Sequence, residues 1–265
     1  MVNNLIRFVH DKIGHLGVIK RCNQIDKNYW FPNRKTRVHN FINNCLTCVY
    51  YSASARVNNQ NMHSIPKKPV PFDTIHIDHL GPLPTSSLKK KYILVVIDAF
   101  TKLVKLYPTA STGAREVCNA LNQYFSYYSR PKRIISDRGT CFTSGQFANF
   151  LSSRGISHIL NATASPQANG QVERVNRVIR PILSKLSQNS DYSDWVSQIH
   201  SVEYALNNTI HSSTHFAPAT LLFGIEQRGP ILDEITEHLE DKNNQPRKNL
   251  QTIRAEASTN IRKSW

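Results

Sequence analysis

Three acidic residues, Asp78, Asp137 and Glu173, have the types and the settings that metal-dependent phosphodiester chemistry requires. Asp78 lies inside an alternating apolar segment, Asp137 ends a short apolar run, and Glu173 lies in a stretch with helical spacing. Two divalent ions about 4 Å apart can activate an attacking oxygen and stabilise a leaving one. Mg²⁺ takes oxygen ligands from a few carboxylates, with waters and phosphate oxygens completing its shell. We therefore treat the three acids as candidate catalytic residues and as ligands of two Mg²⁺ (or Mn²⁺) ions.

Each acid also has an ordinary structural interpretation. An isolated aspartate at a strand end is usually a turn or cap residue. We interpret Asp98 in this way and assign it no catalytic role. A glutamate on a basic helix often pairs with the residue four positions later, which for Glu173 is Arg177. Residue types alone leave both interpretations open.

Two histidines and two cysteines form a second set of candidate ligands: His10, His15, Cys45 and Cys48. Two imidazoles and two thiolates make a closed, structural Zn²⁺ site, which would stabilise about 50 residues that are too few to rely on their own core. A five-residue step turns about 140° round a helix, so both histidines cannot face one ion from a regular helix. We expect Gly14 to break the helix and let His15 turn inward. The alternative is a buried or redox-active cysteine pair, and Cys22 or His39 could compete as ligands.

The charge of the chain points to a polyanionic partner. Lys and Arg number 33 against 18 Asp and Glu, which gives a formal charge of +15 over 265 residues. Such an excess is typical of proteins that bind nucleic acid or anionic membrane surfaces. The longest apolar run, 92–97, is far shorter than the roughly 20 residues of a membrane span, and the N-terminal residues lack the apolar core of a signal peptide. We expect an intracellular, soluble protein with no membrane partner.

Amide and guanidinium side chains on or beside the Glu173 segment could reach DNA phosphates or base edges next to the metal ions. These candidate DNA-binding residues are Gln167, Asn169, Arg174, Asn176, Arg177 and Lys185. The alternative for each is a solvated basic face.

Hydrophobic spacing predicts the elements that would position these groups. Strands are expected at 72–80, 91–100, 102–108, 132–137 and 156–160, and helices at 113–128, 144–155, 166–188 and 191–209. Three strands followed by alternating helices and strands indicate an α/β domain with a mixed sheet.

Composition divides the chain into four parts. Residues 1–53 hold the candidate zinc ligands, residues 54–70 have the polar, proline-bearing composition of a linker, and residues 71–225 form the α/β domain. Residues 226–265 are charged and helical in spacing, with little to pack on. We interpret them as a charged helical extension, a truncated connector.

From residue 10 to about 224 the chain resembles integrases of retroviruses and long-terminal-repeat retrotransposons, most of all the gypsy-like group. The matching stretches are GHLGVIKR (14–21), YWFP (29–32), CLTC (45–48), PFDTIHIDHLGPLP (71–84), VVIDAFTK (95–102), IISDRGTCFTS (134–144) and SPQANGQVERVNR (165–177). Asp137 and Glu173 have 35 residues between them, the spacing of the D,D-35-E signature of that family. The resemblance implies a ribonuclease-H-like mixed-sheet catalytic core, preceded by a small helical HHCC zinc-binding domain, with Asp78, Asp137 and Glu173 as metal ligands.

The same resemblance implies a function. An integrase trims the 3′ end of element DNA and joins it to target DNA, so the partners would be double-stranded DNA and further copies of the chain. Such proteins are cut from a polyprotein, assemble in cytoplasmic particles and act in the nucleus. The alternative is a domesticated host protein that keeps the zinc domain as a DNA- or protein-binding module.

Overall fold

The computed structural model describes residues 2–12, 14–51, 69–161, 170–186, 194–227 and 249–263. The predicted linker falls almost wholly outside these ranges, as do Gln167 and Asn169. Of Glu173, the structure describes the helical backbone and not the side chain. Among the described residues, none of the helices combines the length and the apolar character that crossing a lipid bilayer requires.

Four short helices form the N-terminal domain, which we call the zinc domain. They are α1 (Val2–Lys12), α2 (Val18–Ile25), α3 (Arg34–Asn43) and α4 (Leu46–Tyr51). Apolar residues at helical spacing turn inward: Ile6 and Val9 of α1, Ile25 of α2 and Val38 of α3 are all buried. This small helical domain agrees with the predicted architecture.

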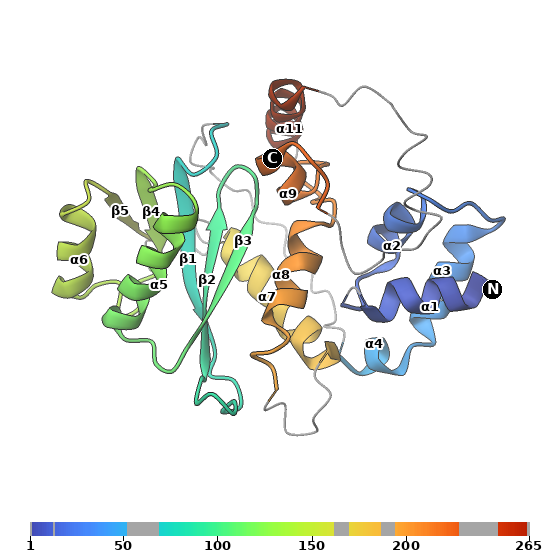
Figure 1. Cartoon of the computed structure of the whole chain (residues 1–265), viewed down its shortest axis with the longest axis horizontal. Helices are drawn as coiled ribbons and strands as arrows, with labels where there is room; N and C mark the ends of the chain where they lie inside the picture. Colours follow the sequence, from blue (N-terminus) through green and yellow to red (C-terminus); the bar gives the residue numbers. More distant parts are fainter. Residues whose placement is uncertain are drawn as a thin grey trace.

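A five-stranded mixed sheet with helices on both faces follows (Figure 1). Its elements are β1 (Thr74–Leu80), β2 (Tyr92–Asp98), β3 (Val104–Thr109), α5 (Ala114–Tyr127), β4 (Arg133–Ser136), α6 (Gly145–Ser152), β5 (Ser157–Leu160), α7 (Gly170–Leu186), α8 (Ile199–Asn207) and α9 (Pro218–Phe223). The strand order is β3-β2-β1-β4-β5. The first three strands pair antiparallel, whereas β4 and β5 continue the sheet from β1 in parallel. The predicted mixed α/β fold class is therefore confirmed.

Alternation along the strands sends their side chains into two separate cores. Ile75 and Ile77 of β1 pack with α5 and α6 on one face. Ile93 and Val95 of β2 pack with α7 and α8 on the other face. The second core continues into the zinc domain, because Ile6, Val9 and Val38 belong to the same apolar cluster. Helix α7 therefore lies between the sheet and the zinc domain (Figure 1).

Two expected elements differ from the structure. The predicted helix at 191–209 is wrong for residues 194–198, which form turns before α8 begins at Ile199. The buried Trp195 holds this segment, because its indole Nε1 donates to the carbonyl of Pro84 at 2.8 Å. The C-terminal helix α11 (Leu250–Lys263) was expected to have little to pack on, yet Ile253 and Ala257 pack against Leu221 of α9.

Asp98 closes the turn after β2. Its carboxylate accepts hydrogen bonds from the Phe72 amide at 2.8 Å, the Thr101 amide at 2.7 Å and the Thr101 hydroxyl at 2.6 Å. The side chain is fully buried, and burial raises the pKa of its carboxyl group against these hydrogen bonds. Asp98 is thus the turn residue that its position in the sequence predicts.

We predict that Asp98→Ala lowers the free energy of unfolding by about 2–4 kcal/mol, because buried donors lose their acceptor. Asp98→Asn keeps one acceptor oxygen and should cost less. Urea denaturation followed by circular dichroism measures both variants. A midpoint for Asp98→Ala that equals the wild-type value would contradict the structural role of this carboxylate.

Candidate functional site

Asp78 lies on β1, and Asp137 comes directly after Ser136, the last residue of the neighbouring parallel strand β4. The register pairs Ile75 with Ile134 and His76 with Ile135. Asp78 and Asp137 each follow the last of these pairs by two residues. Side chains two positions apart along a strand share a face, and adjacent strands lie about 4.8 Å apart. Extending this register to Asp137, one residue past the end of β4, gives Asp78 and Asp137 matching positions on one face of the sheet.

Different neighbours orient the two carboxylates. Asp78 Oδ1 accepts from the His79 amide at 2.8 Å, and its Oδ2 accepts from the Asn176 side-chain amide at 2.8 Å. Asp137 is exposed, and its Oδ1 accepts from the Gly139 amide at 3.0 Å. The Asn176 contact brings α7 onto the strand that carries Asp78.

Helix α7 places the third acid near this strand. Its buried stripe includes Val172, Ile179 and Ile182, whereas Arg174 and Arg177 are exposed. Glu173 precedes Asn176 by three residues, which is just under one helical turn. The backbone of Glu173 therefore lies one turn from the residue that contacts Asp78.

The spacing of residues in the sequence did not single out a further pair, the half-buried His79 and the buried Cys141, which follow the two acids closely along the chain. Cys141 Sγ lies 3.8 Å from His79 Nδ1, and the His79 ring stacks on Phe142 at 5.3 Å. Burial lowers the pKa of His79 to about 4, so its imidazole is neutral at pH 7. Burial, with smaller contributions from Asp137 and Asp78, raises the pKa of the Cys141 thiol to about 11. Both carboxylates thus contribute to the raised pKa of one thiol.

The four predicted zinc ligands converge, with one ligand atom from each within 4.8 Å of the others. His10 Nε2 lies 3.0 Å from His15 Nδ1 and 3.2 Å from Cys48 Sγ. Cys45 Sγ and Cys48 Sγ lie 3.5 and 3.7 Å from His15 Nδ1. Tetrahedral zinc with bonds of about 2.0–2.3 Å requires N–N and N–S separations of roughly 3.3–3.6 Å. The donor set and its spacing fit zinc.

Left-handed backbone at the end of α1 brings the second histidine into this cluster. Helix α1 ends at Lys12, and both Gly14 (φ 74°) and His15 (φ 52°) have positive φ. The predicted break at Gly14 is confirmed. The cluster does not include Cys22 or His39, and the His39 ring instead lies within hydrogen-bonding distance of Asn43.

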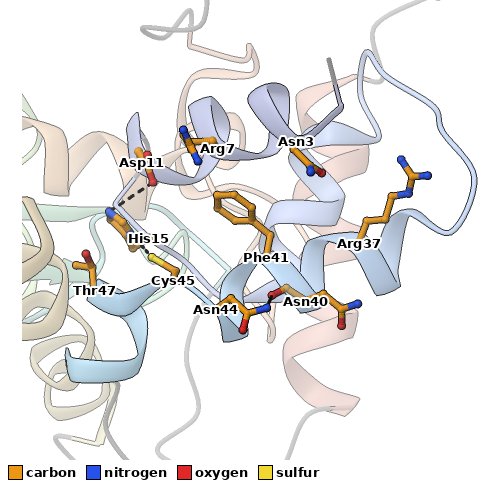
Figure 2. Close-up of a pocket in the computed structure, with 10 residues that line it drawn as sticks. All are labelled: Asn3, Arg7, Asp11, His15, Arg37, Asn40, Phe41, Asn44, Cys45 and Thr47. Carbon is orange, nitrogen blue, oxygen red and sulfur yellow. Dashed lines mark hydrogen bonds and ion pairs between the residues drawn. The ribbon is translucent and has the colours of Figure 1, made fainter.

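Outer contacts surround the cluster. Asp11 Oδ1 lies 3.9 Å from His15 Nε2, the ring nitrogen that faces away from the cluster. His15 and Cys45 also line a polar groove of about 900 Å³ between α1 and α3, beside Arg7 and Arg37 (Figure 2). From helix α7, Lys185 Nζ donates to the His15 carbonyl at 3.4 Å and contacts Cys48 Sγ at 3.7 Å.

The described candidate DNA-binding residues have three different settings. Arg174 and Arg177 are exposed on α7, as a DNA-facing surface requires. Asn176 contacts Asp78, and Lys185 contacts the histidine–cysteine cluster. DNA contact by any of these residues stays a prediction.

Family models match both domains. Residues 1–54 match the model described as an integrase zinc binding domain. Residues 69–166 match the model described as an integrase core domain. The second match contains Asp78 and Asp137 and ends before Glu173.

Relatives extend the likeness over most of the chain. The Pro-Pol polyprotein of feline foamy virus is 34% identical over 237 residues, which cover 88% of this chain and 20% of the polyprotein. The Transposon Tf2-3 polyprotein of Schizosaccharomyces pombe is 27% identical over 222 residues, which cover 82% of this chain and 16% of that protein. The chain thus spans about a fifth of the length of these relatives.

A solved structure shares the fold. It is the cryoEM structure of a simian T-cell lymphotropic virus intasome in complex with PP2A regulatory subunit B56 gamma. The likeness covers 86% of this chain and 76% of the matched chain, with a TM-score of 0.54 and 14% identity. It supports the predicted fold.

The cluster generates a prediction about zinc and pH. Burial lowers the pKa of His10 to about 3 and raises that of the Cys48 thiol to about 11. At neutral pH the His10 ring is already unprotonated, whereas the Cys48 thiol must release its proton when zinc binds. We expect one zinc per chain and an affinity that rises about tenfold per pH unit for each proton released. Competition with a chromophoric chelator from about pH 6 to about pH 8 measures this. An affinity independent of pH would contradict thiolate ligation.

Proposed function

Because residues 1–54 match an integrase zinc binding domain and residues 69–166 match an integrase core domain, we propose that the chain is an integrase for element DNA. It trims the 3′ ends of that DNA and joins them to target DNA. Trimming is hydrolysis of one phosphodiester bond near each 3′ end. Joining is attack of the freed 3′ hydroxyl on a target phosphodiester, with departure of a target 3′ oxygen. One phosphodiester is exchanged for another, so the joining step needs no nucleotide cofactor.

The single observation that carries this proposal is the β1–β4 register, which when extended one residue past β4 gives Asp78 and Asp137 matching positions on the sheet face that α7 contacts through Asn176. These two carboxylates, with Glu173 one turn from the Asp78 contact, offer the oxygen donors that Mg²⁺ or Mn²⁺ takes. The three acids would hold two such ions. Bound divalent ions supply charge stabilisation at the attacking and leaving oxygens of phosphodiester exchange.

The residues of the chain supply orientation and DNA binding. The Asn176 side-chain amide donates a hydrogen bond to Asp78 Oδ2 and so holds the orientation of that carboxylate. Arg174 and Arg177 are exposed on the same helix, where guanidinium groups can hold DNA phosphates and position the reacting bond. The net charge of +15 favours association with a polyanion.

The zinc domain would act structurally, as a closed four-ligand site does. We further propose that the chain works as a homo-multimer on double-stranded DNA, acts in the nucleus, and is released from a longer polyprotein. Relatives that are themselves Pro-Pol polyproteins support the last point.

The decisive variants are Asp137→Asn and Glu173→Gln. Each should lower Mg²⁺-dependent joining of labelled terminal oligonucleotides by at least about 100-fold, because a neutral amide is a poor ligand for a hard cation. DNA binding, measured by fluorescence anisotropy, should stay near the wild-type value. Glu226→Gln is the matched control, because this surface carboxylate lies far along the chain from the three acids and pairs with Lys27.

Joining by either variant at the wild-type rate would overturn the assigned chemistry. The same variants separate this function from that of a DNA-binding host protein, which would keep its cellular function after loss of the acids.

Asn176→Ala tests how Asp78 is oriented. Loss of this amide should lower the joining rate by about 10- to 100-fold and raise the Mg²⁺ concentration for half-maximal rate. A titration of joining rate against Mg²⁺ measures both effects. An unchanged half-maximal concentration would mean that the contact with Asp78 does not support ion binding.

A further inference from the structure

Helix α7 reaches both functional regions of the chain. In its first half, Asn176 donates to Asp78 at 2.8 Å. Near its C-terminal end, the half-buried Lys185 donates to the His15 carbonyl at 3.4 Å and lies 3.7 Å from Cys48 Sγ. Lys185 comes nine positions after Asn176, which is a rise of about 13.5 Å along a helix. One helix thus contacts a candidate catalytic carboxylate and two candidate zinc ligands.

Tight packing accompanies the Lys185 contacts. A Cβ atom on Gly14 would lie 2.9 Å from Ile182 Cγ2 and 3.6 Å from Ala205 Cβ. The turn that carries His15 therefore lies directly against α7 and α8. Because Gly14 also has positive φ, a larger residue there would be disfavoured by backbone strain as well as by contact.

The two domains also share an apolar core along this helix. Ile179, Ile182 and Leu183 of α7 belong to one buried cluster with Val9 and Leu16 of the zinc domain. Protein interiors are close-packed, so they transmit a displacement from one element to its neighbour. A shift of the His15 turn would therefore act on α7.

We propose that Lys185 is a positioning residue that couples the zinc cluster to helix α7. Zinc would fix the His15 turn and Cys48 relative to each other. The His15 carbonyl and Cys48 Sγ together form the binding site of the Lys185 amine. Binding of the Lys185 amine at this site holds α7, the helix that carries Glu173, against the sheet. This inference rests on the proposed function, because it assigns the cluster to zinc and Glu173 to the reaction.

The coupling between zinc binding and the Lys185 contacts is reciprocal, so zinc affinity measures it without DNA. If zinc binding favours the contacts of the Lys185 amine with His15 and Cys48, these contacts must favour zinc binding by the same factor. Contacts to metal ligands of this kind change metal affinity by about 10- to 100-fold. Removing the amine should therefore weaken zinc binding, although Lys185 is not itself a ligand.

The first experiment measures zinc affinity of the whole chain by competition with a chromophoric chelator. Lys185→Met removes the amine and keeps an apolar stem, and we expect about tenfold weaker zinc binding. Lys185→Arg keeps donors for the carbonyl and the sulfur, so its affinity should return toward the wild-type value. Lys35→Met is the matched control, because Lys35 is exposed on α3, and its affinity should be unchanged.

The second experiment follows amide hydrogen exchange with and without zinc. In the wild-type chain, zinc removal should speed exchange in the last turns of α7 by at least about tenfold. Exchange in α6, on the opposite face of the sheet, should stay the same and serves as the internal reference. Lys185→Met loaded with zinc should already exchange fast in α7.

Two results would overturn the proposal. One is zinc affinity in Lys185→Met equal to that in Lys35→Met. The other is α7 exchange in the wild-type chain that does not respond to zinc. Neither result would touch the proposed DNA chemistry, which the Asp137→Asn and Glu173→Gln joining assays test separately.

Discussion

Two acidic residues, one on β1 and one directly after β4, set the central constraint of this molecule. The parallel register of these strands, extended one residue past β4, gives Asp78 and Asp137 matching positions on one face of the sheet. Carboxylates that approach each other repel unless protons, hydrogen-bond donors or cations compensate them. The structure supplies backbone amides and the Asn176 amide as partial compensation. Divalent cations would compensate such a pair more fully, and this is the physical basis of the metal-dependent chemistry that we propose.

Helix α7 connects the sheet face that carries these acids to the zinc domain. Its apolar stripe closes one face of the sheet and is shared with the zinc domain. Its polar side reaches Asp78 through Asn176 and carries exposed arginines. Its last turns reach the zinc ligands through Lys185. A small domain with little core of its own thereby becomes part of the support of the candidate catalytic face.

Local patterns in the sequence predicted much of this arrangement. Alternation around Ile75 and Ile77 predicts β1, and the types and spacing of His10, His15, Cys45 and Cys48 predict the histidine–cysteine cluster, because both signals lie in short stretches of sequence. Contacts between distant segments were not predictable in this way. The Asn176–Asp78 contact, the Trp195 anchor and the packing of α11 on Leu221 depend on how elements meet in three dimensions. The sequence alone placed Lys185 among the candidate DNA-binding residues, and its contacts with His15 and Cys48 were not predictable from spacing.

The most direct test of the account is anomalous diffraction from crystals of the wild-type chain grown with Mn²⁺. The account predicts an anomalous peak within about 2.2 Å of carboxylate oxygens from both Asp78 and Asp137, with a Glu173 oxygen in the same coordination sphere. A clear zinc peak at the histidine–cysteine cluster in the same crystals would show that the metal map is sound. If that zinc peak appears while no manganese lies between Asp78 and Asp137, the paired carboxylates do not form a metal site and the account is contradicted.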